Sequence, residues 1–172
     1  MRFNDLLTDA FTRVHDSVGA AVDGLTIAQA TYRPDPDANS VAWLVWHLTR
    51  VQDGHVSELA GRDQEWVTGG WSGRFGTAPD PSNTGYGHTS QQVAEVVPDA
   101  VETLTRYHQA VCARTEEYLR DLDASDLDRI IDRSYEPPVS VGVRLVSVVN
   151  DNMQHAGQAG YVRGMVERVG QR

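Results

Sequence analysis

Two polar side chains with metal-binding chemistry lie four residues apart in the stretch NDNMQHAGQAGYVRG, residues 150–164. Asp151 and His155 interrupt a face on which Val148 and Val162 recur at helical spacing. Residues i and i+4 of a helix point the same way about one turn apart. A carboxylate oxygen and an imidazole nitrogen can therefore meet at one point, as ligands do in helical metal motifs. The spacing predicts a two-ligand face, although such pairs also occur simply as hydrogen-bonded pairs.

A third candidate ligand lies in another apolar segment, VAWLVWHLTR. His47 is flanked there by Trp43, Leu44 and Trp46, so burial would be costly unless its ring nitrogens are used. Metal sites of helical bundles are built from side chains on facing helices. Two histidines and one carboxylate form the ligand set of open catalytic zinc sites. The alternative is a buried His–Asp pair that only sets the helix register.

The other histidines and the single cysteine give weaker signals. His108 lies on an apolar stripe and is predicted to be a core histidine. Cys112 lies beside the same stripe, where a small buried side chain is expected rather than a nucleophile. His15 and His88 carry no signal beyond their residue type.

Periodic apolar residues predict the elements that must position these side chains. Steps of three and four recur in four segments, and Asn39 or Ser40 is a suitable N-cap for the second, with Gly61 just past its end. No segment shows convincing strand alternation. The sequence therefore predicts an all-α four-helix bundle with one long crossover loop, forming a single domain over residues 1–172. The predicted helices cover about residues 3–22, 40–59, 98–122 and 140–166.

The predicted crossover, residues 61–87, is much longer than an ordinary connection, and such loops are functional or disordered. Its four aromatic residues favour an ordered loop, because they offer large areas for packing. A packed connection without chemistry remains the alternative. The aromatic residues are Trp66, Trp71, Phe75 and Tyr86.

Composition restricts the partners of the chain. The formal net charge of −9 argues against nucleic-acid binding and against binding to an anionic membrane. No apolar run is long enough for a membrane span, and one cysteine allows no internal disulfide, so a cytoplasmic location is expected. All 15 basic residues are arginine. This bias indicates a GC-rich bacterial genome such as that of an actinomycete.

Together these segments resemble the DinB superfamily, in particular its actinobacterial DUF664-like branch. VAWLVWHLTRVQDGH and NDNMQHAGQAGYVRG carry the resemblance, and TGYGHT and PPVSVGVRLVSVV extend it over nearly the whole chain. It implies a four-helix bundle, commonly a homodimer, with a divalent metal held by His47, Asp151 and His155. Many members have histidine where this chain has Asp151, and the similar maleylpyruvate isomerase branch has glutamate. Zinc is the first choice of metal, before nickel, manganese or iron.

The superfamily includes transferases and isomerases that use low-molecular-weight thiols. A thiol loses its proton on binding to a metal and becomes a nucleophile at neutral pH. The resemblance thus implies a metal-dependent thiol S-transferase that detoxifies small electrophiles, and the arginine bias selects mycothiol as its thiol. The alternatives are a hydrolase with metal-activated water and a non-catalytic bundle.

Four more residues are expected near this site. Gln158 shares the ligand face and would orient a ligand or the thiol, or form a simple core hydrogen bond. His55 lies two turns after His47 and can contact the same cavity. Tyr161 and Arg163 are candidates for cofactor binding or for closing the helix end.

Overall fold

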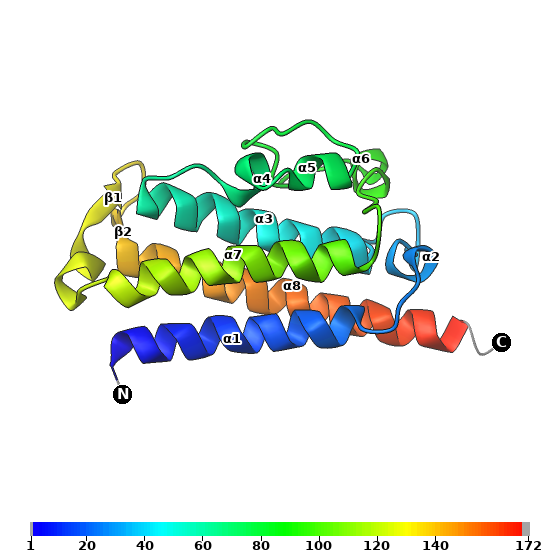
Figure 1. The fold of residues 1–172 in the computed structure, drawn as a ribbon, viewed down its shortest axis with the longest axis horizontal. Coiled ribbons are helices and arrows are strands. Elements are labelled where there is room, and N and C mark those ends of the chain that lie inside the picture. The colour runs from blue at the N-terminus through cyan, green and yellow to red at the C-terminus, as the bar shows by residue number, and fades with distance from the viewer. Residues whose placement is uncertain (1, 170–172) are drawn as a thin grey trace.

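The structure is a computed structural model that describes residues 2–169, so the ends of the predicted domain lie outside the described residues. Four long helices form a bundle, as the sequence predicted. α3 and α7 run in the same direction, opposite to α1 and α8 (Figure 1). The long helices are α1 (Phe3–Val22), α3 (Val41–Ala60), α7 (Glu102–Asp121) and α8 (Val141–Val169).

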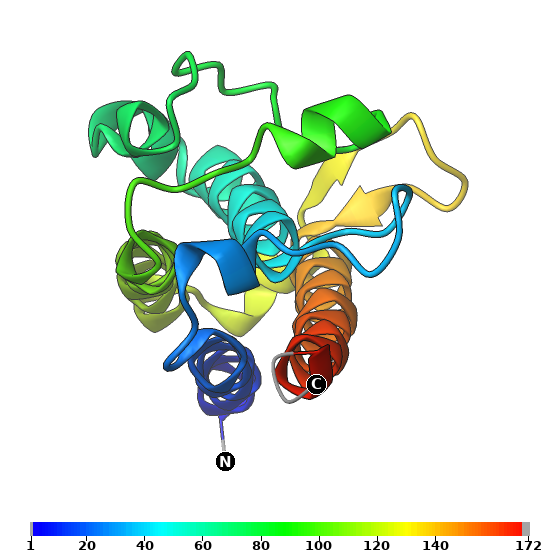
Figure 2. The ribbon, with the colours of Figure 1, turned by 90° about the vertical axis from the view of Figure 1, so that its right-hand side faces the viewer.

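Each long helix has two neighbours around the bundle. α1 packs against α7 and α8, and α3 packs against the same two helices, so α1 and α3 lie diagonally opposite (Figure 2). Because α3 and α7 are parallel, the chain between them must return along the whole bundle. The crossover therefore lies over one side of the molecule rather than at its end (Figure 1).

Short elements occupy the connections. The two strands form a small antiparallel sheet in which Ile130 pairs with Ser140, which the sequence pattern did not indicate because the strands are so short. No helix within residues 2–169 is long and apolar enough to span a membrane. The short elements are α2 (Ile27–Ala30), α4 (Glu65–Thr68), α5 (Trp71–Arg74), α6 (Ser90–Ala94), the 3₁₀ helix η1 (Ala124–Asp128), β1 (Ile130–Asp132) and β2 (Val139–Ser140).

The predicted helix ends follow from local capping. α3 begins where the Ser40 hydroxyl accepts a hydrogen bond from the Trp43 amide (3.1 Å), as an N-cap does. It ends at Gly61, whose φ of 62° lies in the left-handed region that favours glycine. α7 begins at Glu102 instead of near Pro98, because a turn precedes it. α8 extends three residues beyond the predicted Val166.

Several polar side chains are buried within the bundle, and they pair with one another. Gln52 on α3 links α3 to two other helices. Its amide nitrogen donates to Thr115 on α7 (2.9 Å), and its oxygen accepts from Asn152 on α8 (2.7 Å). His108 is completely buried, as predicted, and its Nδ1 lies 3.1 Å from the Thr49 hydroxyl. These bonds fix the helices in register.

The buried His108 should make the stability of the protein depend on pH. Burial, with a contribution from His15, lowers the pKa of His108 to about 3. The unfolded chain takes up a proton below about pH 6.5 that the folded chain cannot accept, so stability is lost as pH falls from 6.5 towards 3. In urea unfolding, metal-free protein should lose up to about 1.4 kcal/mol per pH unit more than the His108→Gln variant. Comparison between pH 6.5 and 5 avoids most carboxylate titration, and parallel curves for the two proteins would contradict the expectation.

Candidate metal centre

The three predicted ligands lie together where α3 packs against α8. His47 comes from α3, and Asp151 and His155 come from adjacent turns of α8. Each offers one ligand atom, and these atoms lie within 4.8 Å of one another. His47 is buried, whereas the α8 pair is half-buried. The buried face of α8 itself passes through Asn152, one residue away, so the predicted ligands lie on its flank at the cavity.

His47 is held in the protonation state that a metal ligand needs. Its Nδ1 lies 2.5 Å from the carbonyl oxygen of Thr84, which can only accept a hydrogen bond. The ring hydrogen therefore lies on Nδ1, and Nε2 keeps its lone pair. Burial lowers the pKa of His47 despite this hydrogen bond, so the ring is neutral. Trp43 stacks on the imidazole with 4.6 Å between ring centroids and fixes its plane.

His155 is oriented by its two neighbours on α8. Its Nδ1 donates to Gln158 Oε1 (2.9 Å), and its Nε2 faces Asp151 Oδ1 at 3.5 Å. The hydrogen bond to Asp151 raises the pKa of His155. Burial opposes ionisation of Asp151, but the interactions with His155, His47 and His55 together outweigh burial and lower the pKa of Asp151. Within residues 2–169, the other oxygen of Asp151, Oδ2, is buried without a hydrogen-bond partner.

These observations fit a bound divalent cation. Both histidines give their Nδ1 hydrogen to a protein acceptor, which is how metal-ligating histidines are held. A buried carboxylate oxygen without a partner is costly, and a metal ion would satisfy it. Two imidazoles and one carboxylate suit zinc in an open site. Gln158 contacts His155 as an orienting residue would, and its role towards a metal ligand stays a prediction.

The crossover takes part in this site. Thr84, which accepts the hydrogen bond of His47, and its neighbour Gly85 belong to the TGYGHT segment. Gly85 has a φ of 92°, and a Cβ atom there would lie 2.8 Å from Trp46 and 3.0 Å from His47 Nδ1. Only glycine lets the loop backbone approach the ligand so closely. The crossover is therefore an ordered wall of the site rather than a remote connection.

Gly85→Ala is expected to weaken metal binding about 10- to 100-fold, because it displaces the group that orients His47. Affinity would be measured by competition with a chromophoric zinc chelator. Gly87→Ala is the matched control, since Gly87 also has a positive φ of 74° but has open space around its Cβ position. Equal losses in both variants would show that backbone strain alone, and not the contact with His47, determines the effect.

Two cavities border the ligand cluster and share Val51, His55 and Asp151. One, of about 440 Å³, is lined also by His47 and Tyr86. The other has about 420 Å³. His55 thus lies where the sequence placed it, beside the cluster, and its pKa is lowered by burial and by a neighbouring guanidinium. The two cavities give space for small reactants next to the ligands.

That guanidinium belongs to Arg144, which sequence reasoning missed. Its Nη1 donates to His55 Nδ1 (2.8 Å), and its Nη2 lies 3.7 Å from Asp132. Arg144 is the one charged residue in the segment SVGVRLVSVV and precedes Asp151 by two helical turns. This position, two helical turns before Asp151, was the sequence signal that could have identified Arg144 as a residue of the site. The side chain lines the 420 Å³ cavity and presents positive charge there.

A buried ion pair holds the crossover on α3, and it too was missed. Asp53 Oδ1 accepts from the Glu65 amide (2.9 Å), and Oδ2 accepts from the Trp66 amide and the Tyr107 hydroxyl (2.8 Å each). Arg50 lies 3.4 Å from the same carboxylate and donates to carbonyl oxygens of the loop. These loop acceptors include Asn83 and Pro81, both at 3.0 Å.

Asn83 also connects the Arg50–Asp53 ion pair to the part of the crossover that forms a wall of the metal site. His88 accepts a hydrogen bond from Trp43 Nε1 (3.2 Å) through Nδ1, and its Nε2 donates to Asn83 Oδ1 (2.8 Å). His88 also stacks on Trp46. His88, which carried no signal in the sequence, therefore holds the side chain of Trp43, which stacks on His47.

Tyr161 and Tyr86 lie differently from expectation, whereas Arg163 takes one of its two predicted positions. Arg163 does not line the cavities described above: its Nη1 donates to the carbonyl oxygens of Ala20 and Asp23, both at 2.6 Å, at the end of α1. This is the alternative helix-closing role. Tyr161 is 67% exposed and Tyr86 is 93% exposed, so Tyr86 borders the cavity instead of packing with the other loop aromatics.

Comparisons with known proteins agree with this architecture. The profile of the family described as mycothiol-S-transferase matches residues 6–168. A crystal structure of a conserved protein from Enterococcus faecalis is similar with a TM-score of 0.90 and 34% identity, covering 96% of this chain and 98% of that chain. No curated protein matches the chain. The resemblance to the DinB superfamily is thereby confirmed, and the chain belongs to the mycothiol-S-transferase family.

Proposed function

We propose that this protein is a divalent-metal-dependent mycothiol S-transferase acting on small electrophiles. The observation that carries the proposal is the convergence of His47, Asp151 and His155 beside a 440 Å³ cavity. Membership of the mycothiol-S-transferase family supports the choice of thiol. Zinc is the proposed metal, because two imidazoles and one carboxylate leave a coordination position free.

The residues of the chain perform three tasks in this proposal. His47 presents a neutral Nε2 atom, His155 would present one once it has lost the proton that it shares with Asp151, and Asp151 would supply negative charge. Bound metal would lower the pKa of a coordinated thiol so that it is nucleophilic at neutral pH. Because His155 and Asp151 otherwise share a proton, metal binding is expected to release it. Thr84 and Gln158 hold the two imidazole planes, so the ligands need little reorganisation.

The two cavities provide the space for the reactants. Thiol and electrophile must both lie next to the ligand cluster for carbon–sulfur bond formation, in which the thiol sulfur bonds to the electrophilic carbon. In a substitution, the bond from that carbon to the leaving group breaks, the leaving group departs with the electron pair, and the thiol proton goes to it or to solvent. In an addition to a double bond, the π electron pair moves to the neighbouring atom, which takes up a proton in place of the one that the thiol lost. Arg144 lines the second cavity and offers a guanidinium to an anionic group on the electrophile. A homodimer and a cytoplasmic location remain predictions.

The decisive assay combines zinc-loaded protein with mycothiol and a bimane electrophile. We expect conjugation that chelation abolishes and added zinc restores. Activity that persists without mycothiol would instead indicate the hydrolase. A metal-loaded protein with no activity on a panel of electrophiles would favour the non-catalytic bundle. Replacing mycothiol by glutathione tests whether the thiol is selected.

A further inference from the structure

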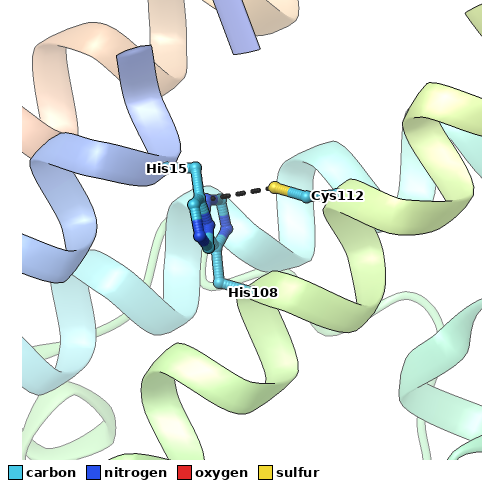
Figure 3. Close-up of side chains that lie close together, drawn as sticks. All are labelled: His15, His108 and Cys112. Atoms are coloured by element: carbon cyan, nitrogen blue, oxygen red, sulfur yellow. Dashed lines mark hydrogen bonds between the residues drawn. The ribbon is translucent and has the colours of Figure 1, made fainter. Parts of the chain in front are cut away.

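A second cluster of potential ligands lies between α1 and α7, away from the site above. It consists of His15 on α1 and of His108 and Cys112 on α7 (Figure 3). Their ligand atoms lie within 4.8 Å of one another, and Cys112 Sγ is 3.4 Å from His108 Nε2. His108 and Cys112 are four residues apart, so both face the same point from one helix. The proposed transferase reaction uses none of the three.

The hydrogen bonds of His108 leave Nε2 available for a ligand. The Thr49 hydroxyl donates to the carbonyl oxygen of Val45 (2.7 Å), so its oxygen must accept from His108 Nδ1 (3.1 Å). The ring hydrogen therefore lies on Nδ1, and the lone pair of Nε2 points at Cys112 Sγ. This is the arrangement that holds His47 in the first site. Without a cation, the Cys112 thiol donates its hydrogen to that lone pair.

The residues around Cys112 can stabilise its sulfur atom as a metal ligand. Gln52 Nε2 lies 3.8 Å from Sγ, while its other partners, Thr115 and Asn152, fix the orientation of the amide. An N–H group directed at sulfur stabilises a thiolate. Burial nevertheless raises the pKa of Cys112 to about 12, so the sulfur keeps its proton unless a cation replaces it.

His15 supplies the independent indication of a ligand. Its Nδ1 is buried and has no hydrogen-bond partner within residues 2–169, and its ring stacks on that of His108 at 5.5 Å between centroids. A cavity of about 220 Å³ reaches His15 and Cys112 from the surface, with Glu116 on its wall. The cavity gives a path of entry, and the carboxylate attracts cations to it.

We propose that His15, His108 and Cys112 form a binding site for one cuprous ion. The thiolate is a soft ligand and the two imidazoles also suit copper, so this set of ligands favours Cu(I) over hard cations. A structural zinc site almost always has four ligands, whereas this cluster offers three among residues 2–169. Charge gives the stronger argument. Cu⁺ replaces the thiol proton one for one, so the buried site stays neutral, whereas Zn²⁺ would leave a net positive charge in the core.

The test measures Cu⁺ transfer from bicinchoninate to the protein without oxygen. Wild type and His155→Ala are each expected to bind one Cu⁺ at this cluster, and Cys112→Ser to bind it at least about 100-fold more weakly. X-ray absorption at the copper edge should show one sulfur and two nitrogen neighbours in both copper-binding proteins. The His155→Ala arm separates this site from the first one.

Folding is checked by far-ultraviolet circular dichroism and by the melting temperature of metal-free protein. If Cys112→Ser fails to fold, His15→Phe on the half-exposed side of the cluster takes its place. Equal Cu⁺ affinity of wild type and the folded variant would overturn the proposal, as would the absence of Cu⁺ binding by wild type. Displacement of Cu⁺ from the cluster by an equimolar amount of Zn²⁺ would overturn the choice of ion.

Discussion

His155→Ala is expected to remove metal from the first site and to lower the proposed thiol-transfer rate at least about 100-fold. Losing even a group that orients a ligand typically costs 10- to 100-fold in metal affinity or activity, and His155 is itself one of three ligands. Its removal also leaves Asp151, already half-buried, without its hydrogen-bonded partner. Metal content by mass spectrometry and the bimane assay give the two readouts.

Gln154→Ala is the matched control for that variant. Gln154 is the adjacent residue of α8 and is exposed, so its loss should change neither metal content nor rate. Full metal content in His155→Ala would exclude His155 as a ligand. Normal metal content with a reduced rate would place it in substrate binding instead.

Asp53→Ala is expected to destabilise the protein by about 3–5 kcal/mol. The substitution leaves the completely buried Arg50 guanidinium without a counter-charge, and breaking a buried pair in this way is strongly destabilising. The amides of Glu65 and Trp66 and the Tyr107 hydroxyl lose their acceptor as well. The free energy of unfolding in urea measures the effect.

Asp9→Ala provides the comparison. Asp9 and Arg13 form a closer ion pair, with 2.7 Å between Arg13 Nε and Asp9 Oδ2, on the exposed face of α1, and exposed pairs add little stability. If Asp53→Ala were no more destabilising than Asp9→Ala, the buried pair would not be what holds the crossover. Amide hydrogen exchange at residues 65 and 66 should also accelerate in Asp53→Ala and stay unchanged in the control.

The sequence predicted the helices well, because each has its own local signals. The stripe of α1 is uninterrupted, and its predicted ends, Phe3 and Val22, are those of the structure. Ser40 and Gly61 marked α3 through capping and a left-handed residue. The small sheet was missed, since two or three residues per strand give no measurable alternation.

The ligand trio could be predicted because its chemistry is unusual for its positions. An aspartate and a histidine four apart on a helix with an apolar stripe carry a signal without any tertiary information, and so does a histidine that follows two tryptophans in an apolar segment. Whether they bind metal remains a prediction. Their exact face could not be predicted, because Asp151 and the fully buried Asn152 differ by only one residue along α8.

The remaining features depend on contacts between distant segments. From the sequence, Arg50 and Asp53 look like an ordinary surface ion pair at i and i+3. Only the folded structure shows that the crossover buries them. Nothing in the local sequence around Thr84 predicts that its carbonyl oxygen accepts a hydrogen bond from His47, which lies 37 residues earlier. The grouping of His15 with His108 requires knowing that α1 and α7 are neighbours, which the stripes alone do not give.

The parallel course of α3 and α7 affects which parts of the sequence can diverge during evolution. The three predicted ligands of the first site lie on the helices α3 and α8, while a separate segment, the crossover that the parallel course requires, closes one side of the cavity through Thr84 and Tyr86. Substitutions around the exposed Tyr86 can reshape the entrance without moving a ligand. In the proposed transferase, reactivity and substrate choice would thus belong to different parts of the chain, and the second could diversify while the first is preserved.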